Sequence, residues 1–189
     1  MLKQLKDLVG IRPGIHMSTV PNGKVHLLMP SLFDSFGSLD KRQKPQLEMS
    51  GRIEKHLLQK GDVLLAVKGT SYSAVEYQPE WGEAVASSSF VVLRRTEIRA
   101  QIVDPKYLVW FLRKQQTQKM LKSMAMGSGV PMVSTANLAT LEVDLPSMEV
   151  QRLIAEAHEL HTKERAIRRE LDRLQEQLFE QQLTKISKR

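Results

Sequence analysis

The sequence predicts an α+β fold, in which a mixed, mainly β domain with a few short helices is followed by a long C-terminal coiled-coil helix. Two observations predict this fold class. Up to residue 146, short apolar runs are separated by Gly, Pro, Ser and Asn. Beyond residue 146 no Gly or Pro occurs, and Glu, Gln, Arg, Leu and Ala dominate, which is a composition typical of helices. We therefore expect one domain over residues 1–146 and one helix over residues 147–189.

Four short segments of the first domain have strand patterns. Residues 24–29 form an apolar run that ends at a proline, and residues 62–67 form a buried-strand pattern after a glycine. Residues 86–93 lead into a pair of arginines, and residues 141–145 alternate apolar and polar side chains. These segments predict that the domain is built on β-sheet.

One helix is expected within the same domain. It begins at Asp104-Pro105, because Asp suits the N-cap and Pro suits the first helical position, where its missing N–H costs nothing. The glycine-rich residues 127–129 end it. Its apolar side is marked by Tyr107, Leu108, Phe111, Leu112, Leu121 and Met124.

The C-terminal helix carries an apolar seam with alternating steps of four and three residues, interrupted at Glu164. The seam consists of Leu153, Ala157, Leu160, Ile167, Leu171, Leu174 and Leu178. A helix over residues 147–189 would be roughly 60 Å long, which is too long to bury this seam against a domain of this size. A second helix is therefore expected, from another copy of the chain or from a different protein. The alternative is a solvated helix that packs only at its base.

The composition limits the classes of protein that this chain can be. Its 189 residues suffice for one core-bearing domain with an extension or for two small domains. The absence of cysteine excludes a disulfide scaffold and thiolate metal sites. No apolar run is long enough to span a bilayer, and the N-terminus lacks the pattern of a secretory signal. We expect a cytoplasmic protein without membrane contact.

The charge distribution favours a polyanionic partner. The chain has 28 basic and 21 acidic residues, a net charge of +7. Residues 1–146 contain 19 basic and 13 acidic residues, and within them residues 1–60 contain 10 basic and 5 acidic residues. Nucleic acid is the natural partner of such a surface, although many basic proteins bind none.

Catalytic motifs are missing from the sequence. It has no Walker pattern, no G-x-G-x-x-G, no G-x-S-x-G and no motif for a flipped adenine. Asp62 and Lys68 faintly resemble a metal-dependent nuclease pair, but a second acid at the required spacing is lacking. His158 and His161 lie one helical turn apart without a convincing third ligand. We expect no catalytic activity, no metal and no cofactor.

A polar, glycine-containing segment directly follows the strand predicted over residues 62–67. Residues 68–73 contain a cation, the hydroxyl side chains of Thr and Ser residues, and an amphipathic aromatic residue. Loops that leave a rigid strand often carry contact residues, and Lys68 could bind a guanine edge or a phosphate. An ordinary hairpin turn explains the same pattern.

Four segments resemble the DNA-specificity subunit of type I restriction–modification systems. Residues 5–14 are similar to the opening of that family, and residues 58–69 resemble its L-x-x-GD-apolar-G strand. Residues 104–108 resemble the start of its recognition-domain helix, and residues 145–154 resemble its LP-x-x-x-x-Q-x-x-I junction into the conserved helix. Together these segments extend over nearly the whole chain, in the order and spacing of the family.

The resemblance implies half of such a subunit, since a full family member has two target-recognition domains and two conserved helices. It implies sequence-specific recognition of double-stranded DNA, without catalysis, for a partner DNA adenine methyltransferase subunit and, in complete systems, a restriction subunit. Two copies joined by antiparallel helices would form a homodimer that reads a bipartite site. A coiled-coil assembly adaptor that no longer reads DNA is the alternative, and a nuclease or methyltransferase fragment is disfavoured by the missing motifs.

This interpretation selects two sets of candidate contacts with DNA. The base contacts predicted are Lys68, Thr70, Ser71, Tyr72 and Ser128. The phosphate contacts predicted are Lys41, Arg42 and Lys44, because cations position a protein on the backbone while base-edge contacts specify the sequence.

Overall fold

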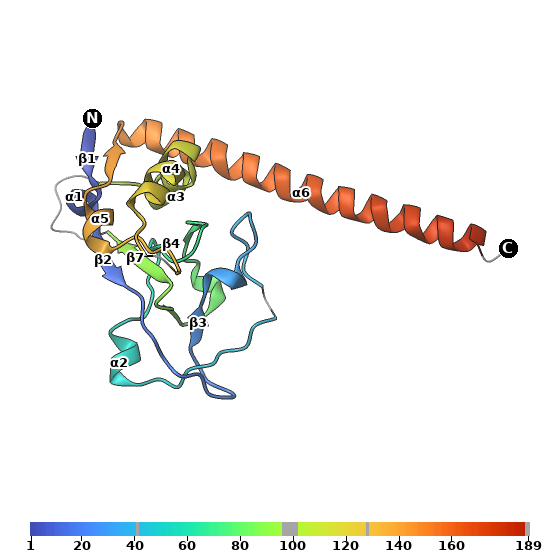
Figure 1. Ribbon diagram of the computed structural model, residues 1–189, viewed down its shortest axis with the longest axis horizontal. Coiled ribbons are helices and arrows are strands. Elements are labelled where there is room, and N and C mark those ends of the chain that lie inside the picture. Colours follow the sequence, from blue (N-terminus) through green and yellow to red (C-terminus); the bar gives the residue numbers. More distant parts are fainter. Residues whose placement is uncertain (41, 96–101, 128, 188–189) are drawn as a thin grey trace. The chain divides into compact units, whose positions relative to one another are not determined.

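The computed structural model describes residues 1–40, 42–95, 102–127 and 129–187 (Figure 1). Two compact units are present, one over Met1–Ala155 and one over Glu156–Arg189. The first unit contains small sheets and short helices, and the second consists of the greater part of one long helix. The predicted α+β fold class is confirmed.

Four antiparallel strands form the largest sheet of the first unit. Their order is β2 (Gly10–Pro13), β7 (Phe90–Arg94), β4 (Val63–Ala66) and β5 (Ala74–Glu76). The two central strands are buried along almost their entire length, which explains why β4 has the continuous apolar sequence VLLA. The strand predicted over residues 62–67 is thus the centre of the sheet.

Two smaller sheets complete the β-structure that the described residues form. Strand β1 (Leu2–Gln4) pairs antiparallel with β8 (Glu142–Asp144), so the start of the chain is held beside the segment that precedes the long helix. Strand β3 (His26–Leu28) pairs parallel with β6 (Ala84–Ala86).

The single strand predicted over residues 86–93 is wrong, because a turn divides this segment. Strand β6 ends at Ala86 and β7 begins at Phe90. Between them, the backbone N–H of Phe90 donates to the carbonyl of Ser87 at 2.9 Å and closes the turn. The three consecutive serines of this segment are therefore a connection between two sheets.

Five short helices lie in the described part of the first unit. They are α1 (Leu5–Leu8), α2 (Gly51–Glu54), α3 (Pro105–Arg113), α4 (Gln115–Met124) and α5 (Thr135–Ala139). Two single 3₁₀ turns occur over Pro30–Leu32 and Pro79–Trp81.

The helix predicted from Asp104-Pro105 begins as expected but is divided in two. The Asp104 carboxylate accepts from the backbone N–H groups of Lys106 and Tyr107, as an N-cap does. Lys114 then adopts an extended ψ of 138°, which ends α3 and starts α4. The side chain of Gln118 donates to the Leu112 carbonyl at 2.7 Å and satisfies an acceptor exposed by this break.

Both faces of the largest sheet are covered by hydrophobic cores. Val63, Leu65, Val91 and Leu93 face a core that includes residues of α1, α3, α4 and α5. Leu64, Ala66, Phe90 and Val92 alternate with them and belong to a second core. A smaller third cluster lies around β3 and α2.

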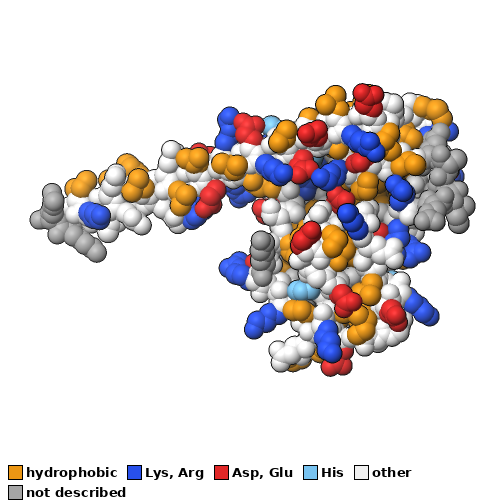
Figure 2. Space-filling view, turned by 180° about the vertical axis from the view of Figure 1, so that it is seen from behind, with side chains coloured by type: hydrophobic (Ala, Val, Ile, Leu, Met, Phe, Trp, Pro, Cys, Tyr) orange, Lys and Arg blue, Asp and Glu red, His pale blue; other side chains and the backbone are white. Residues whose placement is uncertain are grey.

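The long helix α6 (Met148–Ser187) has 40 residues, so its length is roughly 60 Å. Only Gln151 and Ala155 are buried along it. Leu171 and Leu174 of the predicted seam are 51% and 50% exposed in this single chain. Figure 2 shows hydrophobic side chains repeated along the helix between charged ones. The helix and its exposed heptad seam are consistent with a coiled coil.

No helix in the described ranges combines the length and the apolar character that crossing a membrane requires.

Candidate nucleic-acid interface

Two segments that the sequence analysis selected separately lie side by side. Lys68, directly after β4, forms an isolated antiparallel bridge with Met132, which follows the loop after α4. The Gly69 N–H donates to the Pro131 carbonyl at 2.9 Å, and the Val133 N–H donates to the Val67 carbonyl at 2.9 Å. Residues 68–71 thus lie beside residues 126–127 and 129–132, and we call these described residues the paired-loop surface.

The second of these loops is a closed turn with an apolar exterior. Met126 and Met132 exchange two backbone hydrogen bonds, of 3.0 and 2.9 Å. Gly127 has a φ of +119°, a conformation that favours glycine. Met126 and Val130 are 74% and 68% exposed. Ser128, a predicted base contact, lies outside the described residues.

The first loop exposes hydroxyl groups beside a tethered cation. Thr70 and Ser71 are exposed, and Lys68 is half-buried. The Lys68 ammonium group donates to the Ser88 hydroxyl at 3.2 Å and retains two further N–H donors. Gly69 has a φ of +94°, which lets the chain turn sharply between Lys68 and Thr70. The loop therefore presents hydrogen-bond donors and acceptors, and its backbone is held in place by hydrogen bonds to the neighbouring segment.

Tyr72 is the exception among the predicted base contacts. Its side chain is 2% exposed and belongs to the core that covers one face of the sheet. Its carbonyl accepts from the Gln118 side chain at 2.8 Å. The chain returns to the sheet here to form β5, and burial of a large aromatic ring stabilises the core more than an exposed position would. The structure therefore places Tyr72 in the core and not among the exposed residues where the base contacts were predicted.

The predicted phosphate contacts differ in their surroundings. The Arg42 guanidinium binds the Asp40 carboxylate through Nε at 3.0 Å and Nη2 at 2.9 Å. Hydrogen bonds from Arg42 lower the pKa of Asp40, and the same side-chain bond raises the pKa of Arg42. Lys44 is exposed and makes no ion pair with any described residue. Lys41 lies outside the described residues.

Asp62, the acidic residue of the Asp62 and Lys68 pair that faintly resembles a nuclease motif, has a structural role. Asp62 is buried, and both its oxygens accept from Arg94, at 2.7 and 2.6 Å. One of these oxygens also accepts from the backbone N–H of Gln59 at 2.8 Å. Within the described ranges, no group of three His, Asp or Glu side chains could hold a metal ion.

Exposed apolar residues of the paired-loop surface were not among the predicted contacts. Met126, Val130 and Met132 are exposed and lie close in sequence to Gly127 and Gly129. Their sequence signal is weak, because an isolated Met or Val between glycines and a proline is equally compatible with a buried position. Only the exposed fractions of these side chains in the folded chain show that they lie outside the core.

Comparisons with known proteins identify the family of this small α+β domain joined to a long helix. A model of the type I restriction modification DNA specificity domain matches residues 3–173. The chain belongs to this family. No curated protein sequence matches it.

Solved structures of the same kind share the fold at low sequence identity. The type I restriction-modification S subunit from M. genitalium is 15% identical, with a TM-score of 0.55 over 83% of this chain and 37% of that one. The HsdS subunit from Thermoanaerobacter tengcongensis is 16% identical, with a TM-score of 0.58 over 88% and 38%. A chain from a structure of type I R-M complex assembly and conformational transition is 15% identical, with a TM-score of 0.62 over 94% and 41%. The chain thus matches only about two fifths of the length of these proteins.

Proposed function

We propose that this chain recognises a specific sequence of double-stranded DNA and so acts as the specificity component of a type I restriction–modification system. Its membership in the DNA specificity domain family carries this proposal. The net charge of +7 and the meeting of the two predicted loops on one surface support it independently.

The paired-loop surface is the proposed base-reading element. Lys68, Thr70 and Ser71 supply the donors and acceptors that can distinguish base edges in the major groove, and Ser128 stays a proposed contact. The exposed side chains of Met126 and Val130 are suited to contact the methyl group of thymine. Lys44, with Lys41 and Arg42, is proposed to contact phosphates, which position the domain without reading sequence.

Residues 1–146 are the proposed recognition domain, and residues 147–189 are the proposed dimerisation and spacing helix. These residues supply one proposed recognition domain and span about two fifths of the length of the related subunits. Two copies joined through the exposed seam of α6 would supply two, related by a two-fold axis. Such a homodimer favours a palindromic site in two parts.

We further propose that the chain does not itself catalyse a reaction. Its role would be to direct a DNA adenine methyltransferase subunit and a restriction subunit to the site in the cytoplasm. These partners follow from family membership, and the exposed face of α6 offers a surface for helical partners as well as for a second copy.

Selection of bound duplexes from a random library tests the proposal. The full chain is incubated with random double-stranded DNA, and bound duplexes are amplified and sequenced over several rounds. We expect enrichment of one motif with two-fold symmetry and a central gap. Loss of that enrichment in the Lys68→Ala/Thr70→Ala variant would assign it to the paired-loop surface. If the wild-type chain dimerises but enriches no motif, it is an assembly adaptor and the proposal is wrong.

A further inference from the structure

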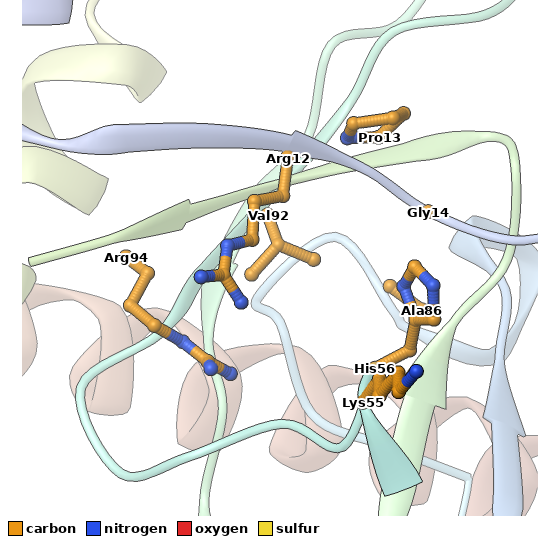
Figure 3. Close-up of a pocket in the computed structure, with 8 residues that line it drawn as sticks. All are labelled: Arg12, Pro13, Gly14, Lys55, His56, Ala86, Val92 and Arg94. Carbon is orange, nitrogen blue, oxygen red and sulfur yellow. The ribbon is translucent and has the colours of Figure 1, made fainter. Parts of the chain in front are cut away.

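A pocket on the first unit is lined by cations and contains none of the predicted base or phosphate contacts. Its lining residues are Arg12, Pro13, Gly14, Lys55, His56, Ala86, Val92 and Arg94. Figure 3 shows the guanidinium groups of Arg12 and Arg94 directed into the space that His56 and Lys55 also border. The empty space is about 290 Å³, part of it open to solvent, and neither Asp nor Glu lines it.

The register of the sheet brings two of these cations together. Arg12 of β2 lies opposite Val92 of β7. Side chains alternate between the faces of a sheet, so Arg12, Val92 and Arg94 lie on the same face. Gly14 follows on the same strand, where a Cβ would lie 2.0 Å from the Ser87 carbonyl oxygen. Only glycine allows the backbone to approach so closely, so the wall of the pocket is a fixed part of the fold.

Arg94 of β7 connects the strands on one side of the pocket to the segment that carries Lys55 and His56. Its guanidinium is held by Asp62 and also donates from Nη2 to the Leu57 carbonyl at 2.8 Å. Leu57 directly follows Lys55 and His56, so this bond fixes the backbone that carries them. The pocket is therefore preorganised by a residue whose own charge is paired with Asp62.

The remaining cations leave an unbalanced positive charge. Among the described residues, Arg12, Lys55 and His56 form no ion pair. Arg and Lys side chains are donors without acceptor atoms, and no Phe, Tyr or Trp is among the lining residues. This cluster of donors without an acidic neighbour suits a singly charged phosphate group, which accepts hydrogen bonds and donates none.

We infer that this pocket binds a backbone phosphate of double-stranded DNA, through Arg12 and Lys55 with His56 as a further donor. The inference rests on the proposed function. It adds a positioning contact at a site formed by β2, β7 and the segment after α2, whereas Lys41, Arg42 and Lys44 belong to a different loop. A phosphate held there would orient the recognition domain on the duplex independently of its sequence.

The salt dependence of DNA affinity measures this contact. Binding of the full chain to a random-sequence duplex is followed by fluorescence anisotropy at several salt concentrations, for wild type and for Arg12→Gln/Lys55→Gln. Each neutralised phosphate contributes about 0.9 to the slope of log affinity against log salt concentration. We expect the variant to lose about that amount, with equal fold losses on preferred and random duplexes. Both residues are exposed, so the variant should keep the wild-type circular dichroism spectrum.

A charge-matched control distinguishes an effect of the pocket on the salt slope from an effect of net charge. Lys6→Gln/Lys185→Gln also removes two exposed positive charges, but neither residue lines the pocket. We expect its salt slope to equal that of wild type. If both double variants lose the same slope, or if neither does while wild type binds DNA, the pocket is not a phosphate site and the proposed function is unaffected.

A titration with inorganic phosphate distinguishes the source of the anion. The ring proton resonances of His56 are followed by NMR in wild type and in Arg12→Gln/Lys55→Gln. If wild type binds duplex DNA, and duplex DNA displaces inorganic phosphate from this pocket, the inference is supported. If inorganic phosphate shifts His56 but duplex DNA neither displaces it nor binds, the pocket is a free-anion site and the inference is wrong.

Discussion

The side-chain oxygen of Gln151 accepts a hydrogen bond from the backbone N–H of Asp104 at 2.9 Å. The amide nitrogen of the same side chain donates to the carbonyls of Pro146 at 3.0 Å and Ile102 at 3.4 Å. Gln151 is 1% exposed and lies in the first turns of α6, while Asp104 caps α3. One amide thus joins the start of the long helix to the start of a core helix. It is the Gln of the LP-x-x-x-x-Q-x-x-I segment.

Replacing this amide should lower the stability of the first unit. Gln151→Ala leaves the part-buried N–H of Asp104 without its acceptor, which should reduce the free energy of unfolding by about 1–3 kcal/mol. Urea unfolding followed by circular dichroism measures the loss. Arg152→Ala, at the next and exposed position of the helix, should change it by less than about 0.5 kcal/mol. Equal losses in the two variants would show that the amide contacts contribute nothing.

The buried pair of Asp62 and Arg94 should be strongly coupled. Arg94→Met leaves the Asp62 carboxylate buried without its cation, which should cost about 3–5 kcal/mol of unfolding free energy. Asp62→Asn/Arg94→Met should be less destabilised than the sum of its two single variants, because neither charge remains unpaired. The measurement is a double-mutant cycle in urea. Arg42→Met, which breaks the exposed pair with Asp40, should leave stability nearly unchanged, and simple additivity at residues 62 and 94 would disprove the coupling.

Base reading and phosphate contact should separate by mutation. Lys68→Ala and Thr70→Ala should each reduce discrimination between preferred and random duplexes, by about 1–3 kcal/mol where a good base contact is lost. Lys44→Ala should instead weaken binding on all duplexes and lower the salt slope by about 1. Competition binding with selected and random DNA measures both effects. A uniform loss for Lys68→Ala would place that residue on a phosphate.

The apolar seam of α6 should hold the dimer together. Leu171→Glu/Leu174→Glu places charges on two exposed seam positions and should yield monomers in sedimentation equilibrium, because a carboxylate cannot be buried between two helices without a partner. Leu171→Met/Leu174→Met keeps the seam apolar and should remain dimeric. An unchanged mass in the glutamate variant would show that the chain does not associate through this seam.

Stability should fall at mildly acidic pH because of His26. Burial lowers the pKa of His26 in the folded chain, so the unfolded chain binds the proton more readily. Stability is therefore highest above the unfolded pKa of about 6.5 and decreases as the pH falls below it. Thermal unfolding of His26→Gln between pH 7.5 and 5 should show a smaller decrease than wild type. His16→Gln, at an exposed position, is the control and should follow wild type.

Local patterns were sufficient to predict much of the secondary structure. The Asp104-Pro105 start of α3 and the start of the long helix after Ser147 are set by capping chemistry between neighbours in the sequence. The central position of β4 follows from its uninterrupted apolar residues. The break at Lys114 was not predicted, because the contacts of Gln118 that accompany it reach Tyr72 in another part of the chain.

Only part of the candidate site, too, could be predicted from local sequence. Its polar loop after β4 could be recognised from the sequence, but the burial of Tyr72 depends on how that loop packs against the core. The Lys68–Met132 bridge and the pocket that combines Arg12, Lys55 and Arg94 join residues far apart in the chain. No local sequence pattern predicts such contacts between distant residues.

The sequence alone determined the fold class, the family resemblance and the heptad seam, because these depend on composition and on the spacing of residues near one another. The tertiary structure decided which loop residues stay exposed, which charges are paired, and which strands lie side by side. Those outcomes depend on packing across the sheet, where the energy of each side chain is set by neighbours that the local sequence does not specify.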